Sequence, residues 1–443
     1  MYTSYIGKKF LSQYNRKEGT NLSAKEFFDS VFFELFFNNE QHLMHVGNSP
    51  FFQKPKENDV KLHGSIPKAQ YRNLAKSIET DVPNMAIFVG SQAKDVGGTT
   101  SGQVSDIAVT INQDEMYASW IGEALGIGVS GGYVMLIDEE EVLWALYNGW
   151  KYYRKYLQQT PNVKDKQIET WNGQWLWHWV RPYFNSDYPD DNLNIETSDV
   201  QGKIAIPTQQ WSKVVFALAK KYPNKKITAY AYNLSQTNTT LGFINLYLPQ
   251  VNKVFDLRDK LFADEDTVLE EEELETLSTF YNFKQACKLG TIGLKALEPA
   301  KLREYMPKGS ILYAQGKDYK FNNNESFSNY QLFKIWIIAM LNKTELLEMA
   351  SDIAKILIDI EEQSKDSKRG KTTASQEGKN ILECRTIKSF IEELTVVLEK
   401  SPSNTIFIKR VVEEVVKMPY DLFPLFVTLI KFQYSLNKSK QNQ

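Results

Sequence analysis

The sequence predicts an α+β fold, in which a mixed amino-terminal domain of short strands and helices precedes an all-helical carboxy-terminal bundle. Helical apolar spacing and short strand-like runs are interspersed irregularly through about the first 250 residues. From about residue 329 onward the spacing is helical throughout. Because 443 residues exceed the usual size of one domain, we expect an α+β domain at 1–255, a helical connecting region at 256–328 and a helical bundle at 329–443.

Individual elements follow from local periodicity. Ser23 is the expected cap of an amphipathic helix over 24–36. Strands are predicted at 85–89, 107–111, 131–137 and 227–232, and further helices at 141–157, 208–221 and 281–296. A loop rich in Gly, Ser and Thr is expected at 90–105. The bundle helices are predicted at 330–340, 343–362, 380–400, 405–418 and 420–434, with a hydrophilic break at 364–378.

Charge is balanced overall but unevenly distributed. A formal net charge of −2 argues against a protein that coats nucleic acid by bulk electrostatics. Four lysines nevertheless cluster before the segment 229–248, and an acidic run follows at 264–273. These lysines are Lys220, Lys221, Lys225 and Lys226. The asymmetry fits a protein with one nucleic-acid face.

The two cysteines, Cys287 and Cys384, are far apart in sequence and form no CxxC motif. This argues against a thiolate zinc site and a disulfide scaffold, so both are expected to be buried or incidental thiols. The sequence also shows no secretory signal and no apolar run long enough to cross a bilayer. We therefore expect a cytoplasmic protein with no membrane partner.

Motifs of enzyme chemistry are missing from the sequence. The histidines His42, His45, His63 and His178 form no HExxH, and there is no P-loop or GxSxG elbow. His178 is expected to pack among tryptophans, and the glycine-rich run 126–132 to form a tight turn. The acids at 138–141 are expected to form a solvated helix start. We therefore expect no catalytic residue, no metal site and no cofactor.

The segment 229–248 contains two strand-like runs that flank a block of uncharged hydrogen-bonding side chains. The block comprises Gln236, Thr237, Asn238, Thr239 and Thr240. Amides and hydroxyls both donate and accept hydrogen bonds, so these side chains suit the reading of base edges. The alternative is a polar surface turn whose amides bond the local backbone.

Three short runs occur in a suggestive order, namely NSPFFQ at 48–53, GGTTSGQ at 97–103 and SQTNTTLGF at 235–243. Together with a helical bundle after them, they resemble the large subunit of a type I CRISPR Cascade complex, and the I-B branch in particular. The chain also fits the reduced large subunit of a CRISPR-associated transposon. The carboxy-terminal bundle is similar to the Cascade small subunit.

This resemblance implies a non-catalytic protein that lies at the 5′ end of the guide CRISPR RNA and recognises the PAM in target double-stranded DNA. It would aid duplex opening and R-loop formation, then recruit a nuclease-helicase for antiviral defence or transposition proteins. Its further partners would be the Cascade backbone and guide-end-capping subunits and a small subunit.

The resemblance also implies residue roles. The PAM and DNA contacts would be Gln236, Thr237, Asn238, Thr239 and Thr240 together with Gln92, Lys94, Thr99 and Thr100 from the earlier loop. Lys220, Lys221, Lys225 and Lys226 would contact phosphates. The guide or neighbouring subunits would be contacted by Asn48, Phe51, Phe52 and Gln53, although the two phenylalanines are equally credible as core.

Two other functions fit the sequence. One is a carboxylate-dependent hydrolase or nuclease with its active site beneath the loop at 90–105, which would need two acids to converge in a pocket or on a metal. The other is a protein-binding scaffold, in which the aromatic runs contact other subunits and the polar loops stay solvated.

Overall fold

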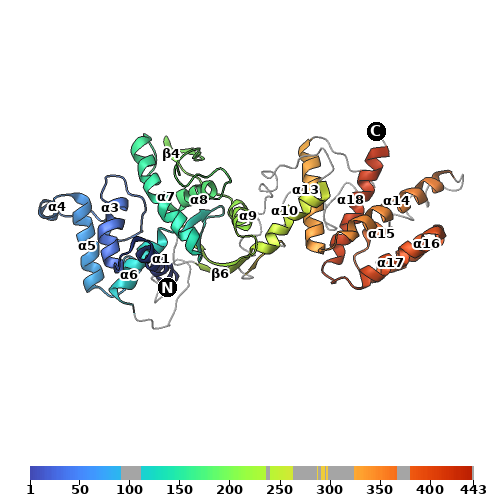
Figure 1. Cartoon of the computed structure of the whole chain (residues 1–443), viewed down its shortest axis with the longest axis horizontal. Helices are drawn as coiled ribbons and strands as arrows, with labels where there is room; N and C mark the ends of the chain where they lie inside the picture. The colour runs from blue at the N-terminus through green and yellow to red at the C-terminus, as the bar shows by residue number, and fades with distance from the viewer. Residues whose placement is uncertain are drawn as a thin grey trace. The chain divides into compact units, whose positions relative to one another are not determined.

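The structure is a computed structural model (Figure 1) that describes residues 1–90, 111–235, 240–262, 287, 291–294, 296–297, 324–366 and 380–441. The chain divides into two compact units, one comprising Met1–Val251 with Asn282–Ala296 and the other Asn252–Tyr281 with Leu297–Gln443. The first unit mixes helices with a sheet, and the described part of the second is helical. The α+β class is therefore confirmed.

A five-stranded sheet forms the centre of the first unit. Its order is β1 (Ile127–Val129), β2 (Tyr133–Ile137), β5 (Lys226–Asn233), β6 (Thr240–Tyr247) and β7 (Thr291–Ile292). All neighbouring strands are antiparallel except β6 and β7, which are parallel. A separate hairpin pairs β3 (Ser198–Val200) with β4 (Lys203–Ala205). Figure 1 shows α8 and α9 on one side of the long strand β6.

The predicted strands at 131–137 and 227–232 are confirmed as β2 and β5. The prediction at 85–89 is wrong, because these residues form turns, and the helix predicted at 281–296 is interrupted by β7. The predicted loop 90–105 and strand 107–111 lie outside the described residues except for their outermost positions, as does most of the connecting region 256–328.

The helices of the first unit are α1 (Tyr2–Glu18), α2 (Ala24–Phe27), α3 (Phe33–Phe36), α4 (Glu57–His63), α5 (Ile66–Thr80), α6 (Gln113–Glu123), α7 (Glu140–Gln159), α8 (Ile168–Trp179), α9 (Trp211–Lys221) and α10 (Leu248–Phe262), the last of which continues into the second unit. A π-helical turn (Phe28–Phe32) joins α2 to α3, and a 3₁₀ turn covers Pro50–Phe52. Ser23 caps α2 as predicted, and the Glu26 carboxylate accepts a hydrogen bond from the Ser23 amide at 2.8 Å.

Helices α1 and α6 pack with their backbones in close contact, and two glycines make this possible. A Cβ atom on Gly7 would lie 1.9 Å from the Ala118 carbonyl oxygen, and one on Gly122 would lie 1.8 Å from the Thr3 carbonyl oxygen. Neither space holds a side chain, so glycine is required at both positions. This contact fixes α1, whose first turn carries Tyr2 to the sheet.

Aromatic side chains dominate the core of the first unit. The largest fully buried rings include Trp120, Trp150, Trp171, Trp175 and Trp211. Arg154 is also buried, and its guanidinium donates hydrogen bonds to the carbonyl oxygens of Leu35, Phe36 and Gln41. His178 is buried beside Trp175 as expected, with ring centroids 5.7 Å apart.

The acids at 138–141 differ from the expectation of a solvated helix start. Each carboxylate contacts a polar group from another element. Asp138 pairs with Lys9, Glu139 with Lys225 at 2.9 Å, Glu140 with Arg16 at 2.9 Å, and Glu141 accepts from the Tyr222 hydroxyl at 2.8 Å. The run therefore ties α7 to α1 and to the turn that follows α9.

The second unit contains α13 (Asn324–Leu341), α14 (Glu345–Asp366), α15 (Asn380–Glu383), α16 (Ile387–Lys400), α17 (Thr405–Val416) and α18 (Phe423–Gln441), with a 3₁₀ turn at Pro402–Asn404. Helix α18 packs against α13, α14 and α15. The predicted helical character of this region is confirmed, but the single helix predicted at 380–400 is wrong, because residues 384–386 separate α15 from α16. Cys287 and Cys384 are both buried free thiols, as expected. Across the described part of the chain, we find no helix long and apolar enough to span a membrane.

Candidate nucleic-acid interface

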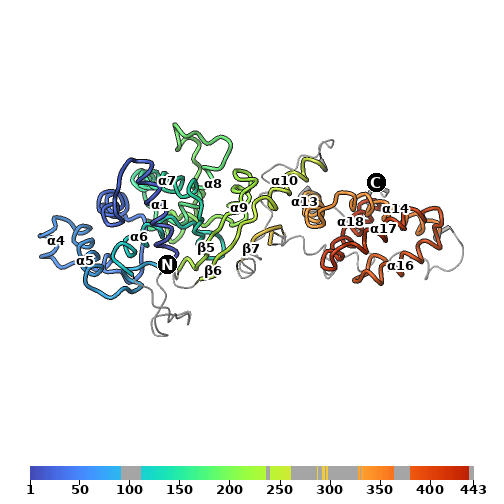
Figure 2. The backbone as a smooth tube through the Cα atoms, turned by 60° about the horizontal axis from the view of Figure 1, so that its bottom comes forward, coloured from blue at the N-terminus to red at the C-terminus, as the bar shows by residue number. Residues whose placement is uncertain are grey.

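Strands β5 and β6 form a hairpin with one buried and one open face, and Figure 2 shows the two strands side by side. The buried face carries Ile227, Ala229, Ala231, Ile244 and Leu246. We define the outer face by three directly opposed pairs, Lys226 with Tyr247, Thr228 with Asn245, and Tyr230 with Phe243. Because successive side chains alternate between faces, this register gathers a cation, two hydrogen-bonding groups and three aromatic rings.

A β-bulge lies where the outer face closes toward the hairpin tip, because Tyr232 beyond it is buried. The register shifts between Ala231 and Tyr232, so that Gly242 opposes Ala231 whereas Thr240 opposes Tyr232. Gly242 has φ 98°, in the region that favours glycine. The extra residue moves Thr240 to the face that carries Tyr230 and Phe243.

Four aromatic rings form a contiguous cluster at this face. Tyr2 lies among the others, with its ring centroid 5.7 Å from Tyr5, 4.7 Å from Tyr230 and 5.1 Å from Phe243. The Tyr230 and Phe243 centroids are 5.3 Å apart. Phe243 is 61% exposed and Tyr5 51%, whereas Tyr2 and Tyr230 are half-buried. Two open rings thus lie against two rings that brace them.

The four predicted phosphate-contacting lysines lie at the end of α9 and the start of β5, which a short turn connects. Lys221, Lys225 and Lys226 are exposed, whereas Lys220 is half-buried. Lys226 Nζ lies 5.4 Å from the Tyr247 ring centroid, and Lys221 Nζ lies 4.0 Å from that of Trp179. Lys225 is the weakest phosphate candidate, because the Glu139 carboxylate already lies 2.9 Å from its Nζ.

Several predicted contacts lie outside the described residues. These are Gln236, Thr237, Asn238 and Thr239 between β5 and β6, and Gln92, Lys94, Thr99 and Thr100 in the earlier loop. Thr240 is the member of the polar block that the structure describes, at the start of β6. The prediction that two strands flank this block is confirmed by β5 and β6.

The predicted guide or subunit contacts divide by burial. Asn48 and Gln53 are exposed, and Phe52 is half-buried with its ring 4.4 Å from that of His45. Phe51 is fully buried, with its ring centroid 4.4 Å from that of Phe37. We therefore assign Phe51 to the core, because its side chain offers no surface to a partner.

Neither the histidines nor the acids of the described residues gather at a metal site. No group of three or more His, Cys, Asp or Glu side chains that could hold a metal ion occurs there. His42 is buried, and this burial lowers its pKa to about 4. Its imidazole is therefore neutral at physiological pH.

A buried acid escaped the sequence analysis. The Tyr232 hydroxyl donates a hydrogen bond of 2.7 Å to the Glu123 carboxylate, although the two residues are 109 positions apart. Burial raises the pKa of Glu123 to about 8, and the nearby Glu169 adds to this effect. Burial likewise raises the pKa of Glu169 to about 7. Glu123 is only 4% exposed, whereas Glu169 is half-buried.

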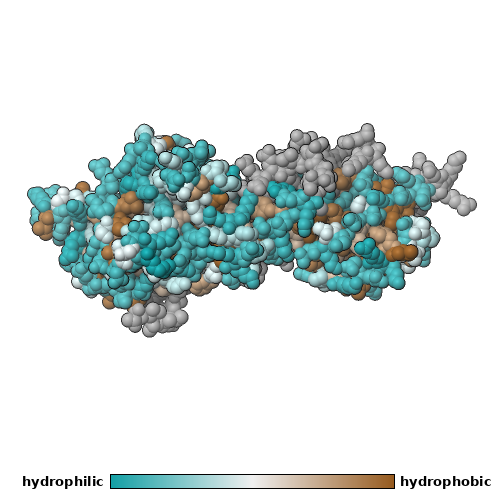
Figure 3. Space-filling model, viewed as in Figure 1, coloured by the Kyte–Doolittle hydropathy of each residue, from teal (hydrophilic) through white to brown (hydrophobic). Residues whose placement is uncertain are grey.

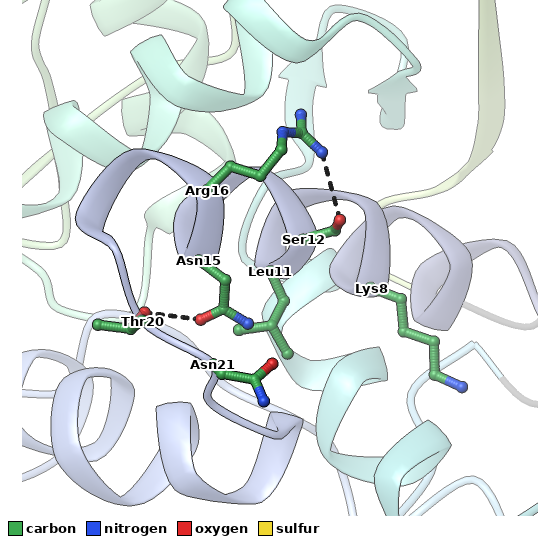
Figure 4. Close-up of a pocket in the computed structure, with 7 residues that line it drawn as sticks. All are labelled: Lys8, Leu11, Ser12, Asn15, Arg16, Thr20 and Asn21. Atoms are coloured by element: carbon green, nitrogen blue, oxygen red, sulfur yellow. Dashed lines mark hydrogen bonds between the residues drawn. The ribbon is translucent and has the colours of Figure 1, made fainter.

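A shallow pocket of about 440 Å³ lies along α1 (Figure 4). It is lined by Lys8, Leu11, Ser12, Asn15, Arg16, Thr20 and Asn21. Several of its polar groups already have partners, since Thr20 donates to Asn15 at 2.7 Å and Arg16 binds the Glu140 carboxylate at 2.9 Å. The face shown in Figure 3 is mainly hydrophilic over the first unit, with hydrophobic residues in small groups. The outer face of β5 and β6 is therefore the stronger candidate site.

Comparisons of the chain with protein-family models, with curated proteins and with solved structures found no match. The functional argument therefore depends on the residues of the candidate site and on their chemistry.

Proposed function

We propose that this chain is a non-catalytic subunit that binds nucleic acid through the outer face of β5 and β6 and the lysines beside it. Its sequence resembles the large subunit of a type I Cascade complex, in particular that of the I-B branch, and we assign it this role. It recognises the PAM in double-stranded DNA, aids duplex opening and R-loop formation, and recruits a nuclease-helicase or transposition proteins.

The observation that carries the proposal is the composition of one open hairpin face. Exposed Lys226 suits a phosphate, and its charge contributes affinity without sequence preference. The Thr228 hydroxyl donates to the Asn245 side-chain oxygen at 3.4 Å, and the amide nitrogen of Asn245 suits a base or sugar edge. The exposed ring of Phe243 suits a base. These are the complementary groups that a nucleic-acid surface requires, and they flank the amide-rich segment 236–239.

Within this proposal the second unit performs the role of the Cascade small subunit. Its described residues form a helical bundle around α18, which is the architecture that the resemblance implies. The guide CRISPR RNA, the backbone subunits and the guide-end-capping subunit complete the assembly.

The proposal is tested by reconstituting the chain with guide RNA and its neighbouring gene products. Binding is measured to duplexes that carry a randomised flank beside a matched target, for the wild type and for Gln236→Ala/Asn238→Ala. We expect a flank preference in the wild type that the double variant loses, because alanine removes both amides. The matched control is Gln158→Ala/Gln159→Ala, which removes two exposed amides at the end of α7.

Flank preference retained by the control and lost by the Gln236→Ala/Asn238→Ala variant supports PAM recognition by this hairpin. If the wild type shows no flank preference or joins no guide complex, the large-subunit proposal is refuted. If both double variants lose the preference equally, recognition does not reside in the hairpin and the residue assignment is refuted.

A further inference from the structure

We propose that Phe243 and Tyr5 form a stacking platform for unpaired bases, so that the outer face of β5 and β6 takes single-stranded nucleic acid. This inference rests on the proposed function and names the form of nucleic acid that this part of the site binds. It concerns described residues only and does not depend on the segment 236–239.

The arrangement of the rings supports stacking. Tyr5 and Phe243 are the exposed ends of a row in which Tyr2 is the middle ring, with centroid steps of 5.7 and 5.1 Å. The Tyr2 and Tyr5 planes differ by 24°, so these two rings are stacked. Phe243 meets Tyr2 edge-on, at 89°. A base on either exposed ring therefore extends an aromatic row that already exists in the free protein.

The platform is held rigidly before any ligand binds. Phe243 is paired across the hairpin with Tyr230, whose ring lies 5.3 Å away, and Tyr2 packs on Tyr230 at 4.7 Å. Tyr5 is fixed by α1 and by its hydroxyl, which donates to the Asp138 carboxylate at 3.3 Å. Because these side chains are already ordered, binding costs little side-chain entropy.

The surroundings favour a nucleic-acid strand over an apolar partner. Thr228 and Asn245 separate Phe243 from the exposed cation Lys226 along the hairpin. Phe243 and Tyr247, which lies beneath Lys226, are four residues apart on one strand, or about 13 Å at the usual rise. A strand can thus place a base on Phe243, sugar or base edges on the polar pair, and a phosphate near Lys226. The Asp138 carboxylate beside Tyr5 pairs with Lys9, which limits its repulsion of phosphate.

Unpaired bases are favoured over a duplex for a geometric reason. The faces of bases within a duplex are covered by their neighbours, so away from the duplex ends an exposed ring can stack only on a base that has left the helix. Stacking on aromatic rings also tolerates any base, because every base has a π-face. The platform therefore binds opened strands without sequence preference, whereas duplex recognition belongs to other groups.

The test uses the purified full chain and dye-labelled 20-nucleotide oligomers in fluorescence anisotropy titrations. The ligands are single-stranded DNA, single-stranded RNA and a DNA duplex of the same sequence. We expect Phe243→Ala to raise the single-strand Kd by about tenfold, the loss typical of one stacked base, and the duplex Kd by less than about threefold. Phe243→Trp, which retains a stacking ring, is expected to bind single strands as the wild type does.

Tyr188→Ala is the matched control, because Tyr188 is an aromatic residue of the same unit that is 63% exposed and outside the four-ring cluster. If Phe243→Ala and Tyr188→Ala weaken single-strand binding equally, or if Phe243→Ala weakens duplex binding as much, the platform is refuted. If the wild type binds duplex with flank preference in the guide complex but Phe243→Ala changes no single-strand Kd, only this inference fails. If the wild type binds none of the three ligands and joins no guide complex, the proposed function fails with it. The DNA and RNA arms identify which strand the platform prefers.

Discussion

Replacing Glu123 by glutamine is expected to change how the stability of the first unit depends on pH. Burial raises the pKa of this carboxyl to about 8, with Glu169 contributing and the Tyr232 hydroxyl opposing. In the unfolded chain a glutamate titrates near about 4.3. The folded state therefore binds the proton more tightly, so its contribution to stability is fully present below about pH 4.3 and is lost as pH rises through about 8.

The magnitude follows from linkage. Between the two pKa values, the free energy of unfolding falls by up to about 1.4 kcal/mol for each pH unit. From pH 5.5 to pH 7.5 the wild type should therefore lose about 2 to 3 kcal/mol through this group. Glu123→Gln carries a neutral amide at every pH, and its oxygen can still accept the Tyr232 hydrogen bond. The variant should gain about that amount over the wild type across the interval.

Urea denaturation followed by tryptophan fluorescence measures this difference. Eight of the nine tryptophans lie in the first unit, so the signal reports mainly on its unfolding. Glu79→Gln, at an exposed glutamate of α5, is the control and is expected to follow the wild-type pH dependence. Unfolding free energies of wild type and Glu123→Gln that stay parallel from pH 5.5 to pH 7.5 would refute the reasoning, because the carboxyl would then be no harder to ionise in the fold than in the unfolded chain.

Three further predictions concern packing and charge. Phe51→Ala should lower the unfolding free energy by about 3–5 kcal/mol, and Phe52→Ala by clearly less, because only Phe51 is fully buried; equal losses in urea denaturation would contradict the core assignment. Arg154→Met should cost about 3 kcal/mol in the same assay, since three carbonyl groups lose their donor; an unchanged midpoint would show that water replaces the guanidinium. For binding to nucleic acid, Lys226→Gln should reduce the slope of log Kd against log salt concentration by about 1. Lys225→Gln should reduce this slope by less, because the Glu139 carboxylate already pairs with Lys225. A slope for Lys226→Gln equal to that of the wild type would exclude Lys226 from phosphate contact.

Elements whose pattern lies within one short window were predictable from the sequence. Apolar spacing located the helix after Ser23 and most of the bundle helices, and short strand-like runs located β2 and β5. The apolar run 85–89 gave the same strand signal but does not join the sheet. Its backbone groups form hydrogen bonds with side chains instead. The Ile87 carbonyl accepts a hydrogen bond from the Trp120 indole, and the Val89 amide donates one to the Ser119 hydroxyl. Such partners come from a distant helix and leave no local trace.

Long-range pairing explains the other differences. Thr291–Ile292 forms β7 because β6 offers a free edge, not because of the spacing within 281–296. The acids at 138–141 have partners on α1 and in the residues after α9, whereas a single window shows only a charged helix start. The bond between Glu123 and Tyr232 joins α6 to β5 across 109 positions. The charged residues of a segment therefore do not indicate which of them form ion pairs in the folded protein, because their partners come from distant elements.

At the candidate site, the alternation of side chains along a strand predicts the strands but not every residue of the face that they present. Alternation alone identifies β5 and β6, but it assigns Thr240 to the same face as Ile244, which is buried. The bulge at Gly242 inserts one residue and reverses this assignment, so that Thr240 opposes Tyr232 and joins the outer face. Which polar side chains a hairpin presents beyond its bulge thus depends on a single backbone conformation that glycine permits. The sequence alone predicted Lys226 and Thr240 as contacts but not Phe243, Thr228 or Asn245, because the face that these residues share is set by the register.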